Sequence, residues 1–193
     1  KRGYRFIIVV GGGKTSRIYQ GAASKIANVS FEDMDWLGIL ATRINAHLLR
    51  ITFGNKAYNK IVTEATGPIK TRKHIIVAAG WKPGWSTDYD AVVLARRFNV
   101  KEIIDAGNIS FVFSEDPEIA NRNGRKLKAI KEISWKDYRT MISRRWIPGR
   151  PSPLDPIAAR HAQKSKIRTL VVIGTDLKNI ENILLGQEFR GTI

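Results

Sequence analysis

Three consecutive glycines, Gly11 to Gly13, follow an apolar run that ends at Val10 and precede a basic segment with a helical pattern. Because glycine has no Cβ atom, successive backbone N–H groups can turn toward an anion, and a following helix N-terminus adds partial positive charge there. Lys14 and Arg17 place full charges beside these glycines. The stretch predicts a phosphate-binding loop between a strand and a helix, although a plain strand-to-helix turn uses the same residues.

A second loop of this kind lies downstream, between Ala78 and Asp88. It follows an apolar run from His74 to Val77 and precedes another helical pattern. The carboxyl ends of parallel strands share one edge of an open α/β sheet, and ligands bind in the crevice at that edge. Both loops are therefore expected to face the same crevice, where two phosphate-bearing ligands can meet.

Strands and helices are expected to alternate along the chain. The patterns predict strands over 6–10, 61–65, 74–79, 101–106 and 170–173, a hairpin arm over 109–114, and helices over 16–27, 31–51, 88–98 and 176–185, with further helix starts at Ser134 and Asp155. Within the helix over 31–51, apolar residues recur at three- and four-residue steps and form one face of the kind that packs on a core: Leu37, Leu40, Ala41, Ile44, Leu48 and Ile51. The repeating order predicts a mostly parallel sheet covered on both faces.

Composition narrows the class of protein. A chain of 193 residues with 43% hydrophobic content suits a single domain, and no run of about 18 uncharged apolar residues or secretory leader is visible. The chain has no cysteine, which excludes disulfides and thiolate metal sites and fits a protein of the cytoplasm. Its three histidines share no metal-ligand spacing, so we predict no metal ion held by the protein itself. The net charge of +16 is of the kind found in nucleic-acid-binding proteins. However, the basic residues are spread along the chain and no recognised nucleic-acid-binding motif accompanies them, so nucleic acid is not the expected partner.

The motifs together resemble those of uridylate kinases in the amino-acid-kinase family. The matching segments occur in family order: Gly11–Arg17 with Tyr19, Asp35–Ile39 with Thr42–Ala46, Pro83–Asp88, Asn108 with Phe113, Asp116 and Pro117, Asp155–Ala159, and Phe189–Ile193. The resemblance runs nearly end to end. It implies a three-layer α/β sandwich around a mostly parallel sheet, formed by one domain over 1–193. The half over about 1–100 would bind UMP and the half over about 101–193 would bind ATP.

The resemblance also implies roles for individual residues. UMP would be contacted by Gly12 and Asp35 and wrapped by one loop, Trp81, Lys82, Pro83, Gly84, Trp85, Ser86 and Thr87. ATP would be contacted by Gly13, Arg17, Asn108, Phe113 and Asp116, with Arg17 and Asp155 as catalytic residues. From the residues alone, Asp35 and Asp155 are equally placed to cap helices. Trp81 and Trp85 can stack on uracil or pack within a lid.

Phosphoryl transfer from ATP to UMP fits these residue types. In such reactions the protein mainly positions two anions and neutralises their charge, so backbone N–H groups, Arg, Lys and Mg²⁺ are the expected tools and no side-chain nucleophile is required. The family resemblance further implies ATP with Mg²⁺ and a homo-oligomer, a hexamer. Two alternatives stay open: a related kinase of the acetylglutamate, isopentenyl phosphate or carbamate type, or a non-catalytic nucleotide- or RNA-binding homologue.

One departure from the family pattern concerns the N-terminus. The family begins with a strand that grips the transferred phosphates, whereas Lys1 to Gly3 leads directly into what resembles the second strand. On ordinary element lengths, roughly 30 to 40 residues comprising a strand, its loop and a helix are expected to be missing. This chain is therefore expected to be an N-terminally truncated form, and a complete ATP site is expected to need the missing strand.

Overall fold

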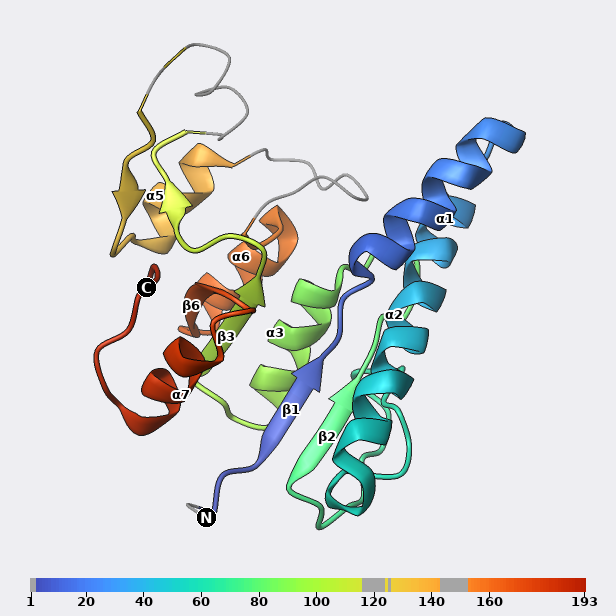
Figure 1. Ribbon diagram of the computed structural model, residues 1–193, viewed down its shortest axis with the longest axis horizontal. Coiled ribbons are helices and arrows are strands. Elements are labelled where there is room, and N and C mark those ends of the chain that lie inside the picture. Colours follow the sequence, from blue (N-terminus) through green and yellow to red (C-terminus); the bar gives the residue numbers. More distant parts are fainter. Residues whose placement is uncertain (1–2, 116–123, 125, 143–152) are drawn as a thin grey trace. The chain divides into compact units, whose positions relative to one another are not determined.

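The computed structural model describes residues 3–115, 124, 126–142 and 153–193 (Figure 1). These residues form two compact units, one ending at Phe98 and one beginning at Asn99. Each unit is built around its own pair of parallel strands. In the described part of the chain no helix is long and apolar enough to cross a membrane.

The first unit contains two strands, three α-helices and a short 3-10 helix. In chain order these are β1 (Phe6–Val9), α1 (Gly13–Ile26), α2 (Phe31–Phe53), η1 (Gly54–Lys56), β2 (Ile75–Ala78) and α3 (Thr87–Arg97). β1 and β2 pair in parallel, with Phe6 opposite Ile75 and Val9 opposite Ala78. The two strands therefore end level with each other, and the loops that follow them leave from the same edge.

Serine caps begin both long helices of the core. Ser30 Oγ accepts from the Asp33 N–H at the start of α2, and Ser86 Oγ accepts from the Tyr89 N–H at the start of α3. Each bond satisfies one of the backbone donors that a helix leaves free at its N-terminus. Because Ser30 caps α2, Asp35 is not the cap that the sequence also allowed.

Helices α2 and α3 cover opposite faces of the first sheet. Side chains alternate along β2, so that Ile76 and Ala78 pack with Leu94 of α3, while Val77 packs with Ala46 of α2. All five of these side chains are buried. Covering both faces of a parallel strand pair agrees with the expected α/β layering.

The described part of the second unit contains four strands and three helices. They are β3 (Glu102–Gly107), β4 (Val112–Phe113), β5 (Ala129–Ile130), α5 (Trp135–Met141), α6 (Pro156–Lys164), β6 (Arg168–Ile173) and α7 (Leu177–Leu185). β3 and β6 pair in parallel, and β4 and β5 form the antiparallel hairpin expected after residue 109. Ser134 caps α5 and Asp155 caps α6, so both predicted helix starts are confirmed.

A buried threonine ties the hairpin to the second sheet. Thr192 Oγ1 accepts from the Val112 N–H at 2.8 Å and donates to the Ile130 carbonyl at 2.5 Å. The backbone of Thr192 also forms an antiparallel bridge with Val171 of β6. One residue near the chain end thereby joins β4, β5 and β6.

The structure corrects two of the predicted elements. Helix α1 begins at Gly13, three residues before the expected start, so the last glycine of the triplet is helical. The strand expected over 61–65 is absent from this described segment, where Val62 forms an isolated parallel bridge with Ala78. A strand there would need continuous pairing, and a single bridge is all that this short segment makes.

The prediction that the apolar face of α2 packs on the core is also largely wrong. Four of its members are exposed, namely Leu40 (49%), Ile44 (61%), Leu48 (66%) and Ile51 (63%). The buried residues over the same stretch are Ile39, Ala41, Thr42 and Ala46, of which Ala41 alone belongs to the predicted face. Periodicity placed the large side chains on one face, but the helix packs on the sheet through a neighbouring face.

Candidate active site

Two loops meet at the carboxyl edge of the first sheet. The glycine loop, Gly11–Gly13, follows β1. The second loop, Gly80–Ser86, follows β2 and is called the substrate loop after the role that the family resemblance implies for it. The Val10 N–H donates to the Ala78 carbonyl at 2.9 Å, and a Cβ placed on Gly11 would lie 4.0 Å from Thr87 Oγ1. The expectation that both loops share one edge is confirmed.

Helix α2 holds the glycine loop through one asparagine. Asn45 Nδ2 donates to the Gly11 carbonyl at 3.0 Å and to the Gly12 carbonyl at 3.1 Å. Gly12 is the N-cap of α1, and the first N–H groups of a helix have no acceptor within the helix. Through these two bonds Asn45 fixes the Gly11 and Gly12 carbonyls against α2.

The same helix holds the start of the substrate loop. Thr42 Oγ1 accepts from the Gly80 N–H at 2.8 Å, and Arg43 Nη2 donates to the Trp81 carbonyl at 3.0 Å. Arg43 Nε also reaches the Gly80 carbonyl at 3.4 Å. Since Asn45 lies within one turn of Thr42, a single turn of α2 fixes both loops relative to each other.

Two carboxylates hold the substrate loop from different helices. Asp35 of α2 accepts from the Gly84 N–H through Oδ2 at 2.6 Å, and Asp90 of α3 accepts from the Trp81 N–H through Oδ2 at 3.1 Å. Gly84 has φ +81°, a left-handed conformation that favours glycine. The backbone donors at both ends of the loop are thus bonded to buried carboxyl groups.

The side chains of the substrate loop pack on one another around a cation. The Trp81 and Trp85 rings lie edge to face at 4.6 Å, and Trp85 contacts Tyr89 at 4.4 Å. Lys82 Nζ lies 4.6 Å from the Trp81 ring centre and 4.8 Å from that of Trp85, within the range of cation–π attraction. The two tryptophans pack within the loop, which is one of their two expected roles.

Burial shifts the pKa of both carboxyl groups upward. Desolvation raises the pKa of Asp35 above its ordinary value, opposed by the hydrogen bond from Gly84. Desolvation raises the pKa of Asp90 to about 7, the Asp88 charge adds to this rise, and the Trp81 N–H and Lys82 oppose it. Asp90 Oδ1 is buried without a hydrogen-bond partner, which explains why the ionised form is disfavoured.

Other predicted residues lie as follows. Arg17 is exposed one turn into α1, and Gly13 is the first residue of that helix. In the second unit, Asn108 is exposed directly after β3, and Phe113 is half-buried on β4. Asp155 is 4% exposed, and its Oδ1 accepts from the N–H groups of Ile157 at 2.7 Å and Ala158 at 3.1 Å. Asp116 lies outside the described residues.

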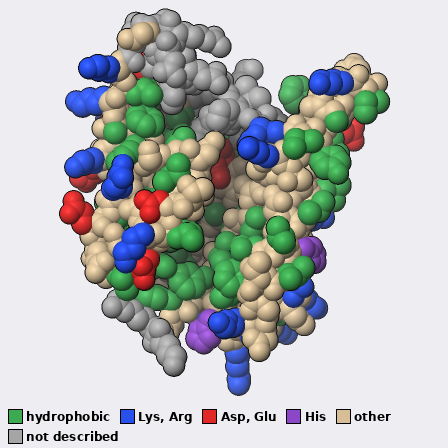
Figure 2. Space-filling model, in the orientation of Figure 1, with side chains coloured by type: hydrophobic (Ala, Val, Ile, Leu, Met, Phe, Trp, Pro, Cys, Tyr) green, Lys and Arg blue, Asp and Glu red, His purple; other side chains and the backbone are tan. Residues whose placement is uncertain are grey.

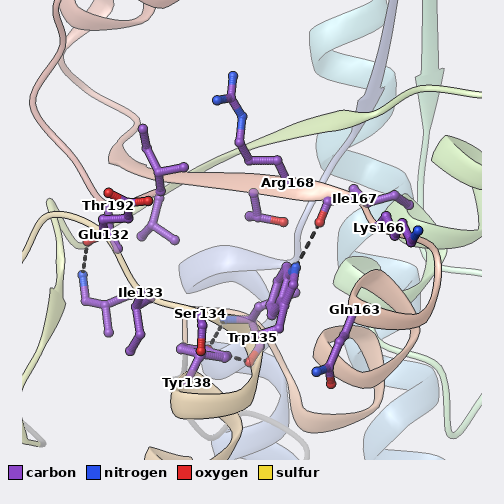
Figure 3. Close-up of a pocket in the computed structure, with 15 residues that line it drawn as sticks. Glu132, Ile133, Ser134, Trp135, Tyr138, Gln163, Lys166, Ile167, Arg168 and Thr192 are labelled. Atoms are coloured by element: carbon purple, nitrogen blue, oxygen red, sulfur yellow. Dashed lines mark hydrogen bonds between the residues drawn. The ribbon is translucent and has the colours of Figure 1, made fainter.

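A separate cavity of about 470 Å³ opens in the second unit between the segment leading into α5, the end of α6 and the start of β6 (Figure 3). Trp135 forms part of its wall and donates its indole N–H to the Ile167 carbonyl at 2.9 Å. The Tyr138 hydroxyl is bonded to Leu154. None of the predicted nucleotide-binding residues lines this cavity, and it opens at the amino end of β6, whereas Asn108 follows the carboxyl end of β3.

Metal ions are held in proteins by clusters of ligand side chains. No group of three His, Cys, Asp or Glu side chains among the described residues lies close enough together to hold one. Mg²⁺ commonly keeps several waters and binds through substrate phosphates together with one or two carboxylates.

Comparison with known proteins decides the family. The model of the amino acid kinase family matches residues 1–172. The uridylate kinase of Hyperthermus butylicus is 32% identical over 99% of this chain and 83% of its own length, and that of Sulfolobus acidocaldarius is 31% identical over 99% and 84%. The chain belongs to the amino acid kinase family. Its similarity to uridylate kinases confirms the resemblance seen in the motifs.

Solved structures support the same assignment. The uridylate kinase of Archaeoglobus fulgidus superposes with a TM-score of 0.81 at 30% identity, over 98% of this chain and 84% of that one. The UMP kinase of Ureaplasma parvum, at 18% identity and a TM-score of 0.71, shares the fold over 96% of this chain and 80% of that one. The predicted α/β class and amino-acid-kinase fold are confirmed.

Sequence reasoning missed how the loops are held. Thr42, Arg43 and Asn45 appeared only as part of a motif, and Asp90 was not singled out. Polar residues close together on an otherwise apolar helix were the available signal in α2. Asp90 carried none, because an acidic residue in the first turn of a helix is ordinary.

Proposed function

We propose that this chain transfers the γ-phosphoryl group of ATP to UMP, giving UDP and ADP. The observation that carries the proposal is the pair of loops fixed side by side by one turn of α2. Near-complete alignment with uridylate kinases supports UMP as the acceptor. We assign UMP to Gly12, Asp35 and the residues from Trp81 to Thr87, and ATP to Gly13, Arg17, Asn108, Phe113 and Asp116.

The proposed chemistry needs positioning and charge neutralisation. A phosphate oxygen of UMP attacks the γ-phosphorus, the bond from that phosphorus to the β,γ-bridging oxygen breaks, and ADP leaves with the electron pair. Loop N–H groups, Lys82 and Arg17 would neutralise the anions. Asp155 would fix the start of α6 through its two backbone bonds. Mg²⁺ would enter as part of the MgATP substrate and neutralise the phosphates. We expect this reaction in the cytoplasm.

A coupled ADP-release assay with MgATP and an acceptor panel tests the function. The panel contains UMP, N-acetylglutamate, isopentenyl phosphate and carbamate, with a reaction lacking acceptor as the control for ATP hydrolysis. ADP release that depends on UMP supports the proposal. Release with another acceptor alone would reassign the substrate. Absence of turnover in a folded protein that binds RNA, with affinity falling steeply as salt rises, would favour the binding-module alternative.

Replacing Asn45 with leucine is expected to lower kcat/KM for UMP by about tenfold to a hundredfold. The leucine keeps the helix but leaves the Gly11 and Gly12 carbonyls without their donor, so the loop can shift. Steady-state kinetics and a thermal melt measure the effect. His47→Gln, an exposed change on the same helix, is the control. Wild-type kcat/KM in Asn45→Leu would show that the asparagine does not position the loop.

The exposed face of α2 supports a homo-oligomer, which the family resemblance extends to a hexamer. Figure 2 shows hydrophobic side chains exposed along α1 and α2, and those of α2 include Ile44 and Leu48. Contiguous apolar patches on a surface commonly mark protein interfaces. The variant Ile44→Lys/Leu48→Lys is expected to reduce the mass measured by light scattering, while Lys56→Glu on η1 is expected to leave it unchanged. An unchanged mass in the double variant would exclude this face as the interface.

A further inference from the structure

We propose that Asp90 is a positioning residue for the substrate loop, which it fixes through the backbone of Trp81 and thereby through the Trp81–Lys82–Trp85 stack. The inference rests on the proposed function, in which this loop binds UMP. Asp90 does not itself touch the substrate in this proposal. Its role is to set where the cation of Lys82 is held.

The contact is built into the core of the first unit. Asp90 is 1% exposed in the first turn of α3, and its backbone N–H is already bonded to the Ser86 carbonyl at 3.0 Å. The side chain therefore has no capping task of its own, since Ser86 Oγ caps the helix at Tyr89. Its Oδ2 instead reaches back across nine residues to the Trp81 N–H.

That bond completes the anchoring of Trp81. Arg43 takes its carbonyl and Asp90 takes its N–H, so both polar groups of this peptide segment are bonded to side chains from different helices. The Trp81 ring then supports Lys82 Nζ at 4.6 Å, and Trp85 supports the same ammonium group at 4.8 Å. Among the six described residues that follow Gly80 in the loop, Lys82 carries the positive charge.

Burying the Asp90 carboxyl group costs solvation free energy, and this cost is consistent with a role in fixing the position of the loop. Asp90 Oδ1 is buried and without a partner, so this side chain gives up solvation for a single backbone bond. Asp88, in the same turn of α3, is only half-buried. The helix dipole favours an acid at either position, so it does not explain why the carboxyl at 90 is enclosed beneath Trp81.

Two substitutions separate the hydrogen bond from the charge. Asp90→Asn keeps an oxygen that can accept from the Trp81 N–H, and Asp90→Ala removes the acceptor while keeping a good helix former. We expect Asp90→Ala to raise the Kd for UMP roughly tenfold. Asp90→Asn should keep it within about threefold, and kcat at saturating UMP should change little in both. Glu32→Gln, an exposed acid of α2, is the control.

Circular dichroism tests, in the absence of substrate, whether Asp90 positions the Trp81–Trp85 pair. Two indoles in edge contact couple in circular dichroism, and Trp85→Phe identifies the signal of the Trp81–Trp85 pair. We expect this signal to be lost in Asp90→Ala and kept in Asp90→Asn. It can be read even if the wild-type chain fails to phosphorylate UMP, so failure of the proposed function and failure of this inference remain distinguishable.

The results that overturn the inference are specific. Asp90→Ala with the wild-type dichroism signal, or with wild-type affinity in a protein that binds UMP, would show that the Trp81 bond does not position the stack. If thermal melts show that Asp90→Ala does not fold, the test rests on Asp90→Asn. Loss of the Trp81–Trp85 dichroism signal in Asp90→Asn overturns the inference. Retention of that signal together with near-wild-type affinity for UMP supports it.

Discussion

Gly12→Ala is expected to reduce kcat/KM for UMP by at least about a hundredfold. A Cβ at this position would lie 2.6 Å from Ser16 Cβ and 3.3 Å from the Gly38 carbonyl oxygen. Neither neighbour is the end of a flexible side chain, so the glycine loop itself must move. A displacement of about 1 Å in a site that positions two reactants can cost a hundredfold in rate. Steady-state ADP release measures the loss.

The clash also offers its own rescue. Ser16→Gly removes the Cβ that Gly12→Ala meets, so the double variant Gly12→Ala/Ser16→Gly is expected to recover much of the lost kcat/KM. The exchange of Ser for Gly inside the helix costs less than about 1 kcal/mol of helix stability. Gly21→Ala, in the same helix with open space around it, is the matched control and should keep full activity. If the double variant is no better than Gly12→Ala, steric displacement by Ser16 is not the cause.

The parts of this fold that could be predicted from sequence are those set by neighbouring residues. Glycines after apolar runs indicated both loops, and Ser134 and Asp155 indicated helix starts, because caps and turns depend on side chains within a few residues. The shared edge of the two loops also followed, since parallel strands impose it. The family resemblance extended this local reading to the fold and the acceptor.

The remaining features depend on contacts that no local pattern encodes. The bonds from Thr42, Arg43 and Asn45 to the two loops span more than 30 residues of sequence. The face of α2 that meets the sheet is set by tertiary packing, as between Ala46 and Val77, and the hydrophobic period alone does not distinguish it from the adjacent exposed face. Asp90 looks like any acidic residue of a first helical turn until its burial is known.

Asp90→Asn is expected to stabilise the protein at neutral and alkaline pH and to have little effect near pH 3. The pKa of Asp90 is raised from 3.8 to about 7 in the folded protein. Between these values the unfolded chain has lost a proton that the native protein still holds, so the free energy of unfolding falls as pH rises. The decline is complete above about pH 7, where ionised Asp90 lies buried with Oδ1 unpartnered.

The size and the pH range of this stabilisation distinguish the titration of Asp90 from that of other groups in the protein. A rise of about three pKa units corresponds to a ceiling of about 4 kcal/mol, which asparagine avoids because it has no charge to bury. The difference in Tm between Asp90→Asn and wild type should therefore grow between pH 4 and pH 8, reaching several degrees for a chain of this size. Groups that titrate in both proteins cancel in that difference. A Tm difference that stays constant over this range would mean that the Asp90 carboxyl group ionises in the native protein as it does in the unfolded chain. Burial of the ionised carboxylate would then not lower the free energy of unfolding.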